Sequence, residues 1–330
     1  MTRQLSVNAE HWPTRTPFRI SGETWTGFDL ITCEITEDGR TGRGEAAGVY
    51  YMNEDAETMS AQIAQVAERI EAGANRQDLL SLLPPGGARN ALDCALWDLE
   101  ARQAGTSVWT LAGVAPDAAS TVFTIGLEDT PAAMAAKAAA ACDRPQLKIK
   151  LSADRPVERI AAIRAARPDA RLIADCNGGW NFAQLKQWAP QMAAFGLSLL
   201  EQPLPRDNDA ELQCYAAPLP LFADESCLHL GELDRVIGRY AGIVIKLDKT
   251  GGLTEALLMA RAGKKHGLRL MVGCMVATSL SMAPAHVLAQ LCEFVDIDGP
   301  LFLTRDKPGG LRYEGAAAIA PVSGFWGTPA

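Results

Sequence analysis

Lysines alternate with large aliphatic residues in the stretch QLKIKLS, which runs from Gln146 to Ser152. The apolar residues predict a β-strand, in which successive side chains point to opposite faces. Lys148 and Lys150 therefore share one face of this strand. Ammonium groups at the end of a buried strand are costly unless charged partners or a substrate meet them. The stretch thus indicates a polar site at this strand end.

Other apolar runs of the sequence also end in charged residues. These residues are Asp175, Glu201, Asp224, Lys246, Asp296 and Asp298. One such residue is usually a cap or part of an ion pair, whereas a set at matching strand ends favours a functional site. The first three are carboxylates from successive strands, which suit a hard cation bound by oxygen ligands. Mg²⁺ fits best, with one ion per subunit.

The lysines can carry out acid/base chemistry beside such an ion. Lys150 and Lys246 end strands on opposite sides of a barrel axis, so they would face each other across whatever the metal holds. Opposed bases around one carbon can remove a proton from one face and return it to the other. Loss of a proton α to a carboxylate gives an enediolate, whose negative charge a divalent cation stabilises.

The pKa values of these lysines must allow proton transfer. Burial, the neighbouring ammonium of Lys148 and the cation would all lower the pKa of Lys150. Lys148 could also donate to a substrate carboxylate. Lys249 is an alternative second base, but the apolar run ends at IVIK, which favours Lys246.

A barrel would bring these strand ends together. From about residue 117, short apolar runs alternate with segments of helical apolar spacing, such as VERIAAIRAARPD. The predicted strands are residues 121–126, 146–151, 170–177, 197–203, 219–225, 242–248, 268–274 and 292–298. Each interval leaves room for one helix. The α/β pattern predicts a (β/α)8-type modified TIM barrel over residues 116–305, with its active site at the carboxyl ends of the strands.

The first part of the chain follows another pattern. Residues 3–49 alternate like antiparallel strands, with EDGR at 37–40 as a hairpin turn, and helices are predicted at 56–72 and 89–104. We therefore expect an N-terminal α+β capping domain over residues 1–115. The tail, 306–330, lacks the barrel pattern and is expected to complete this domain.

Composition limits the possible partners. The chain has 330 residues, 48% of them hydrophobic, and a formal net charge of −8, with no cluster of Lys or Arg. These values argue against nucleic acid and membrane surfaces, and they favour a small-molecule partner, with a possible homo-oligomer. Eight cysteines without a CxxC spacing predict reduced thiols. With no apolar run suited to a signal peptide or a membrane span, we expect a cytoplasmic protein.

Several motifs together resemble a known superfamily. LKIKL, ADCN, LEQPLP, ADES and IKLDKTGGLTEA, in this order, look like the enolase superfamily, in its muconate-lactonizing subgroup, and RNALDCALWDLEAR extends the match into the first domain. VDIDGP resembles the DxD element of the dipeptide epimerases, the L-Ala-D/L-Glu epimerase family. The resemblance implies an isomerase that inverts the α-carbon of the C-terminal residue of a dipeptide.

The resemblance also implies a role for each matching residue. It makes Asp175, Glu201 and Asp224 the metal ligands, Lys150 and Lys246 the acid/base catalysts, Asp296 and Asp298 the site for the substrate ammonium, and Thr124, Lys148 and Cys274 substrate contacts. Family members that act on Ala-Glu carry an arginine in the loop after a TPF segment. Trp25 stands at that place in TPFRISGETWTGF, which favours an apolar or neutral substrate side chain.

Other functions are possible on the same scaffold. o-Succinylbenzoate synthase, N-acylamino-acid racemase and muconate cycloisomerase would use the same metal and lysines, but substrates without an ammonium have no use for the DxD carboxylates. A Schiff-base aldolase would not need the three metal-binding carboxylates. A non-catalytic binding protein would not need the complete set of catalytic groups.

Overall fold

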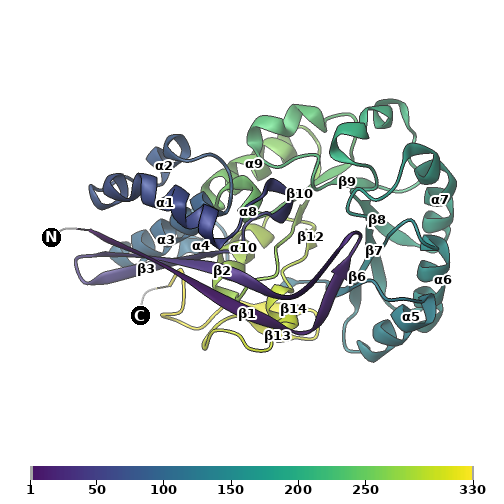
Figure 1. Ribbon diagram of the computed structural model, residues 1–330, viewed down its shortest axis with the longest axis horizontal. Helices are drawn as coiled ribbons and strands as arrows, with labels where there is room; N and C mark the ends of the chain where they lie inside the picture. Colours follow the sequence, from purple (N-terminus) through teal and green to yellow (C-terminus); the bar gives the residue numbers. More distant parts are fainter. Residues whose placement is uncertain (1–2, 329–330) are drawn as a thin grey trace.

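The computed structural model describes residues 3–328. Figure 1 shows a cap, in purple and blue, beside a curled parallel sheet surrounded by helices. The cap consists of β1 (Gln4–Ile20), β2 (Glu23–Glu37), β3 (Arg40–Ala46), the short 3₁₀ helix η1 (Tyr50–Met52), α1 (Ala56–Glu71), α2 (Arg76–Leu82), α3 (Gly87–Ala104) and α4 (Val108–Ala112). The predicted antiparallel strands and both predicted helices are confirmed.

Local sequence accounts for the shape of the cap. Asp38 and Gly39, in the predicted EDGR turn, both have positive φ, which suits a tight hairpin between β2 and β3. Helix α3 then lies directly on β3. A Cβ atom on Gly42 or Gly44 would come within 2.2 or 2.1 Å of a carbonyl oxygen of α3, so the absence of side chains permits this close approach.

The barrel contains the eight predicted strands, each within its predicted run. They are β5 (Phe123–Ile125), β6 (Gln146–Lys150), β7 (Arg171–Asp175), β8 (Leu197–Glu201), β9 (Leu221–Ala223), β10 (Gly242–Ile245), β11 (Arg269–Val272) and β12 (Phe294–Val295). Neighbouring strands pair in sequence order. The first and last meet where Thr121 bridges Val295 and the Val122 amide donates to the Val295 carbonyl at 2.9 Å. The predicted barrel is confirmed.

The connections differ from the prediction in two places. Helices α5 (Pro131–Ala140), α6 (Pro156–Ala166), α7 (Phe182–Ala194), α8 (Leu247–Thr250), α9 (Leu253–Lys265) and α10 (Ser279–Ala289) follow their strands. The connections after β8 and β9 contain only the 3₁₀ helices η2 (Arg206–Asn208), η3 (Ala210–Cys214) and η4 (Leu230–Arg235). Pro205 and Pro218 bracket the first, and Gly231 and Gly238 interrupt the second, so neither favours a full α-helix.

The last part of the chain contacts both the barrel and the cap. After η5 (Gly299–Phe302), strands β13 (Arg312–Glu314) and β14 (Ala317–Ile319) form a small sheet with β4 (Ala119–Ser120). Further on, the Trp326 indole donates to the Arg43 carbonyl at 2.8 Å, and the Gly327 amide donates to Asp98 of α3 at 2.8 Å. The division of the chain at residues 115 and 305 stays a prediction. Within residues 3–328, no helix is long and apolar enough to span a membrane.

Candidate active site

Side chains along each barrel strand alternate between the inside and the outside of the barrel, and this alternation determines where the site lies. A layer of buried apolar side chains fills the barrel: Val122, Ile173, Leu199, Phe222, Val244, Met271 and Phe294. Because side chains two positions apart in a strand lie on the same face, the next inward position belongs to the barrel mouth. At that position the sequence has Thr124, Asp175, Glu201, Asp224, Lys246, Gly273 and Asp296. The polar layer therefore rests directly on an apolar floor.

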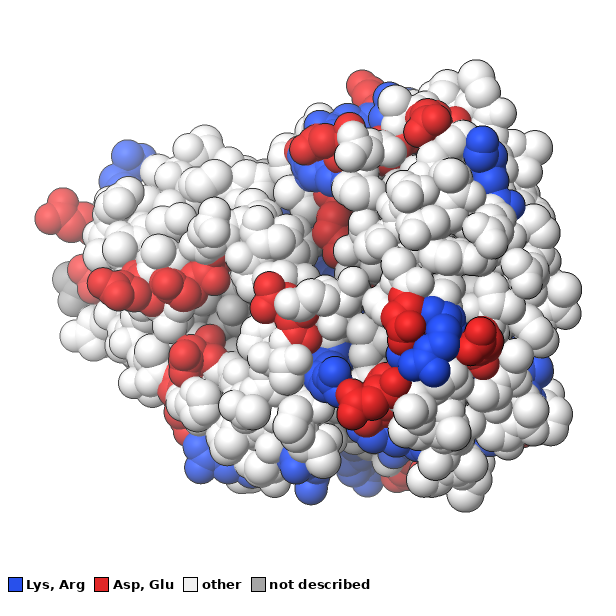
Figure 2. All heavy atoms as spheres, turned by 45° about the vertical axis from the view of Figure 1, so that its right-hand side comes forward, with Lys and Arg blue, Asp and Glu red and all other residues white. Residues whose placement is uncertain are grey.

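A cavity of about 250 Å³ lies between this layer and the cap. Figure 2 shows a hollow between the two parts of the molecule, with acidic atoms in its depth. Eight of the residues expected from the sequence line the cavity: Trp25, Thr124, Lys148, Lys150, Lys246, Cys274, Asp296 and Asp298. The three predicted metal ligands lie beneath it, fully buried, and are in contact with the lysines.

Lys148 is at the centre of the buried charges. Its ammonium lies 2.7 Å from Asp296 Oδ2, 2.8 Å from Glu201 Oε2 and 3.3 Å from Asp175 Oδ2. Burial alone would lower the pKa of Lys148, but these carboxylates outweigh it and hold the pKa well above its usual value. Lys148 thus connects the predicted metal end of the site to the DxD end.

Each predicted base contacts a different carboxylate of the metal-binding set. The Lys150 ammonium lies 2.6 Å from Asp175 Oδ2, and the Lys246 ammonium lies 2.6 Å from Asp224 Oδ2. Burial has the largest single influence and would lower the pKa of Lys246, but Asp224, Glu201 and Glu225 together outweigh it and raise the pKa above its usual value. The sequence-based expectation considered burial, the Lys148 ammonium beside Lys150 and the charge of a cation, and it omitted the carboxylates that contact the lysines.

The three carboxylates fit a hard cation. Lys150 and Lys148 outweigh burial and hold the pKa of Asp175 below its usual value, and Lys246 and Lys249 do the same for Asp224. Glu201 differs, because burial and then Asp175 raise its pKa to about 8. Its Oε2 atom accepts no hydrogen bond, although the Lys148 charge is near. A buried carboxylate oxygen that accepts no hydrogen bond of good geometry, beside two further carboxylates, belongs to a ligand set that Mg²⁺ would complete.

Within the described residues, a group other than the predicted metal ligands brings its potential ligand atoms close together. Potential ligand atoms of Cys274, Asp296 and Asp298 lie within 4.8 Å of one another. The Thr124 amide donates to Asp298 Oδ2 at 2.7 Å, and burial followed by Asp296 raises the pKa of Asp298 well above its usual value. In the predicted metal-binding set, Lys148 bridges Asp175 and Glu201, whereas Asp224 contacts Lys246 and Lys249.

Lys249, the alternative base, lies outside the cavity. It is fully buried, and its ammonium donates to Asp224 Oδ1 at 2.6 Å and to the main-chain carbonyls of Asp224, Val244 and Cys227 at 2.7, 2.9 and 3.2 Å. An ammonium with four acceptors is held in place. The geometry therefore favours Lys246, which lines the cavity, as the second base.

Sequence reasoning missed a residue that links two predicted metal ligands. Gln202 follows Glu201 and has a φ of 34°, a left-handed conformation that is uncommon for residues other than glycine. Its side-chain oxygen accepts from the amides of Asp224 at 2.9 Å and Ser226 at 3.0 Å. The signal was present, because Gln202 and Ser226 belong to the motifs LEQPLP and ADES.

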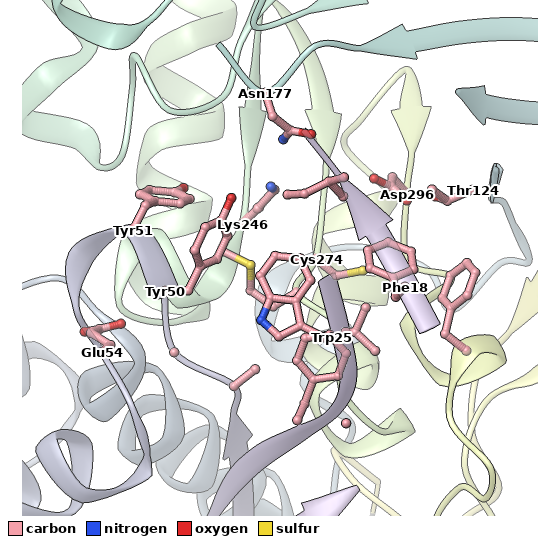
Figure 3. Close-up of a pocket in the computed structure, with 18 of the residues that line it drawn as sticks. Phe18, Trp25, Tyr50, Tyr51, Glu54, Thr124, Asn177, Lys246, Cys274 and Asp296 are labelled. Atoms are coloured by element: carbon pink, nitrogen blue, oxygen red, sulfur yellow. The ribbon is translucent and has the colours of Figure 1, made fainter. Parts of the chain in front are cut away.

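The cap side of the cavity is aromatic, which was predicted only at Trp25. Figure 3 shows Trp25 between Tyr50 and Phe18, with Lys246 and Asp296 above these rings in the view. Tyr50 belongs to the loop after β3, and Asp248 holds that loop on the barrel by accepting from the amides of Ala47 and Gly48 at 3.0 and 3.1 Å. Residues of the cap thus complete a site whose lysines come from the barrel.

The sequence matches known families over most of its length. Residues 2–113 match the model described as the mandelate racemase/muconate lactonizing enzyme N-terminal domain, and residues 132–316 match the model described as enolase C-terminal domain-like. The chain belongs to the enolase superfamily.

Individual relatives narrow its place in the enolase superfamily. The L-Ala-D/L-Glu epimerase of Escherichia coli K12 is 40% identical over 94% of this chain and 98% of the relative. An N-acetyl-D-glutamate racemase of a Pseudoalteromonas species is 40% identical over 76% of this chain and 79% of the relative. These relatives place this enolase-superfamily chain among the isomerases, with the dipeptide epimerases.

A solved structure is also similar. It is an enolase family member from Agrobacterium tumefaciens with homology to dipeptide epimerases, described with bound sodium and L-Ala-L-Glu. The two chains are 43% identical, and the match has a TM-score of 0.96 and covers 98% of this chain and 100% of the other. This chain has the fold of that enolase-superfamily protein.

Proposed function

We propose that this protein is a Mg²⁺-dependent dipeptide epimerase that inverts the α-carbon of the C-terminal residue. The observation that carries the proposal is the placement of Lys150 and Lys246. Both line one cavity, they end different barrel strands, and each contacts a different carboxylate of the predicted metal set. Lysines placed in this way suit proton transfer on opposite faces of one carbon.

Asp175, Glu201 and Asp224 would hold the ion. When bound, Mg²⁺ supplies positive charge beside the substrate carboxylate, where the enediolate gains its negative charge. The ion would also compete with Lys150 and Lys246 for their carboxylate partners. Released from Asp224, Lys246 loses the contact that raises its pKa and can be neutral.

The remaining groups would fix the substrate across the barrel mouth. Lys148 would donate to the substrate carboxylate, and Asp296 and Asp298 would accept from its N-terminal ammonium. The α-carbon then lies between Lys150 and Lys246. The neutral lysine takes the α-proton from one face, and the charged lysine returns a proton to the other, so the pair exchanges charge states in each turnover.

One relative favours a second candidate. The Pseudoalteromonas relative is named an N-acetyl-D-glutamate racemase, and an N-acylamino-acid racemase would use the same lysines and ion. The DxD element of this chain argues against an N-acylamino-acid racemase. Asp296 and Asp298 are 4% and 3% exposed, and an N-acylated substrate would bring no positive charge to these buried carboxylates.

Deuterium uptake tests the proposal. Wild-type protein with Mg²⁺ in D₂O should exchange the C-terminal α-proton of both diastereomers of a dipeptide. Lys150→Ala and Lys246→Ala should each lose epimerisation by about 10²–10⁴. Lys150→Ala should retain exchange with one diastereomer, and Lys246→Ala should retain exchange with the other. Full epimerisation by both variants would contradict the two-base mechanism.

A further inference from the structure

Aromatic rings form a continuous wall on the cap side of the cavity. Ring centroids of Trp25 lie 5.1 Å from Tyr50, 5.8 Å from Phe28 and 6.5 Å from Phe18, and Phe18 lies 5.0 Å from Phe302. All five rings line the cavity, and none of them is fully buried. This apolar surface gains free energy when an apolar group covers it.

The positive charges of the cavity lie on the barrel side. Within residues 3–328 the lining contains three basic residues, Lys148, Lys150 and Lys246, and no arginine. Arg19 is near in sequence, but it lies outside the lining and its guanidinium is 2.8 Å from Asp129, with both side chains substantially exposed. Within the described residues, every cation that lines this cavity therefore comes from a barrel strand, and the cap that bears Trp25 contributes none.

The three carboxylates that the cap contributes to the cavity lining are already engaged. Asp29 lies 2.8 Å from the His11 ring, Glu54 accepts from the amides of Val49 and Gly87, and Asp55 caps helix α1. They add negative charge around the mouth, which opposes a further anion. Because their oxygens serve the fold of the cap, they are not arranged to receive a cationic side chain.

The direction of the substrate side chain follows from the reaction. This step rests on the proposed function. Three groups lie in one plane when the α-carbon becomes trigonal, and the lysines lie above and below that plane. The barrel charges hold the carboxylate at Lys148 and the amide end through Asp296 and Asp298. The third group, the side chain, must then leave toward the cap, where Trp25 lies.

We infer that the epimerised residue has an apolar side chain, aliphatic or aromatic, that packs on Trp25, and that an acidic side chain is rejected. A glutamate carboxylate at the wall would lose water without gaining a cation. At about 1.4 kcal/mol for each tenfold change, this cost corresponds to at least about 100-fold in kcat/KM. The inference does not come from the names of the Escherichia coli and Pseudoalteromonas relatives, because both names specify glutamate.

A series of L-Ala-L-Xaa dipeptides tests the inference, with Xaa as Leu, Phe, Gln, Glu or Lys. α-Proton exchange in D₂O gives kcat/KM for each. Leu and Phe should be turned over fastest, and Gln should exceed Glu, which has the same shape and differs in charge. Glu or Lys as fast as Leu would overturn the inference and leave the proposed function intact. Absence of exchange with every dipeptide would instead overturn the proposed function.

Substitutions at the wall give a second test. Trp25→Arg should raise turnover of Ala-Glu at least about tenfold above Trp25→Ala and lower that of Ala-Phe, because it replaces the ring by a guanidinium. Arg19→Ala is the matched control and should leave the Gln-to-Glu ratio unchanged. A fall in Ala-Glu turnover in Arg19→Ala would contradict the role of Trp25 in selecting the side chain. Equal Ala-Glu turnover by Trp25→Arg and Trp25→Ala would contradict it as well.

Discussion

The Lys249 ammonium lies 2.6 Å from Oδ1 of Asp224, while Lys246 lies 2.6 Å from Oδ2 of the same carboxylate. The two lysines therefore hold one carboxylate from different oxygens. Lys246 lines the cavity, and Lys249 is enclosed by main-chain carbonyls. Their sequence spacing suggests similar roles, whereas their surroundings predict different ones.

Substitution of Lys249 should act through Asp224. Lys249→Gln should lower the exchange of both diastereomers alike, because the carboxylate is no longer held at Oδ1. It should also lower the free energy of unfolding by about 3–5 kcal/mol, since a buried ion pair is broken. Diastereomer-resolved exchange and denaturant unfolding measure these effects. Loss of exchange with one diastereomer only would identify Lys249, and not Lys246, as the second base.

Removal of divalent ions should abolish exchange, and Mg²⁺ should restore it. Asp224→Asn neutralises one of three predicted ligands and should weaken Mg²⁺ binding at least about tenfold in a calorimetric titration. Asp234→Asn, which changes an exposed carboxylate of η4, is the matched control and should bind Mg²⁺ like the wild type. An enzyme that remains active in EDTA would contradict the role of the three carboxylates.

Acetylation of the substrate amine should disrupt the DxD contact. Asp296 and Asp298 are buried, and Lys148 contacts Asp296, so the loss of the substrate ammonium removes the charged partner expected for Asp298 and should cost about 2–5 kcal/mol of transition-state binding. Comparing kcat/KM for a free and an N-acetylated dipeptide measures this loss. Equal values would favour the N-acylamino-acid racemase.

Stability should fall as the pH rises, partly because of Glu45. This buried residue of β3 accepts from the Thr278 amide at 2.9 Å and the Thr278 hydroxyl at 2.8 Å, and burial raises its pKa to about 7. The folded state keeps the proton to a higher pH than the unfolded state. The stabilisation is therefore complete below about pH 4.5 and is lost as the pH approaches 7, up to about 3 kcal/mol.

Glu45→Gln isolates this effect, because the amide keeps an acceptor for Thr278 and does not titrate in this range. The unfolding midpoint of the variant should change less between pH 5 and pH 8 than that of the wild type. Glu57→Gln, on the exposed side of α1, is the control and should behave like the wild type. The same pH dependence in all three proteins would show that Glu45 titrates normally.

The barrel and its charged layer could be predicted because both depend on local alternation. Lys148 and Lys150 are two residues apart, and so are Ile173 and Asp175, which suffices to place them on one face. The contact of Lys148 with Asp296 joins residues far apart in sequence, so it depends on how the barrel closes. Without that contact, the rise in the pKa of Lys148 could not be predicted.

The recognition surface was harder to predict because it is assembled from separate segments. Phe18 belongs to β1, Trp25 to β2, Tyr50 to η1 and Phe302 to η5. No periodicity connects these residues, and only the resemblance to a family drew attention to Trp25. Likewise, the short 3₁₀ helices after β8 and β9 reflect Pro and Gly positions that outweigh the alternation of strands and helices.

The aromatic wall is built from chain that contributes nothing to the barrel sheet. Trp25 and Tyr50 belong to the cap. Asp248 holds the loop before Tyr50 by accepting from main-chain amides, and these contacts do not depend on the side chains of that loop. Substitutions in the wall leave the apolar floor and the strand ends unchanged. Proteins with this fold can therefore evolve a different preference for the substrate side chain through a few substitutions in the cap, while the barrel residues for proton transfer stay the same.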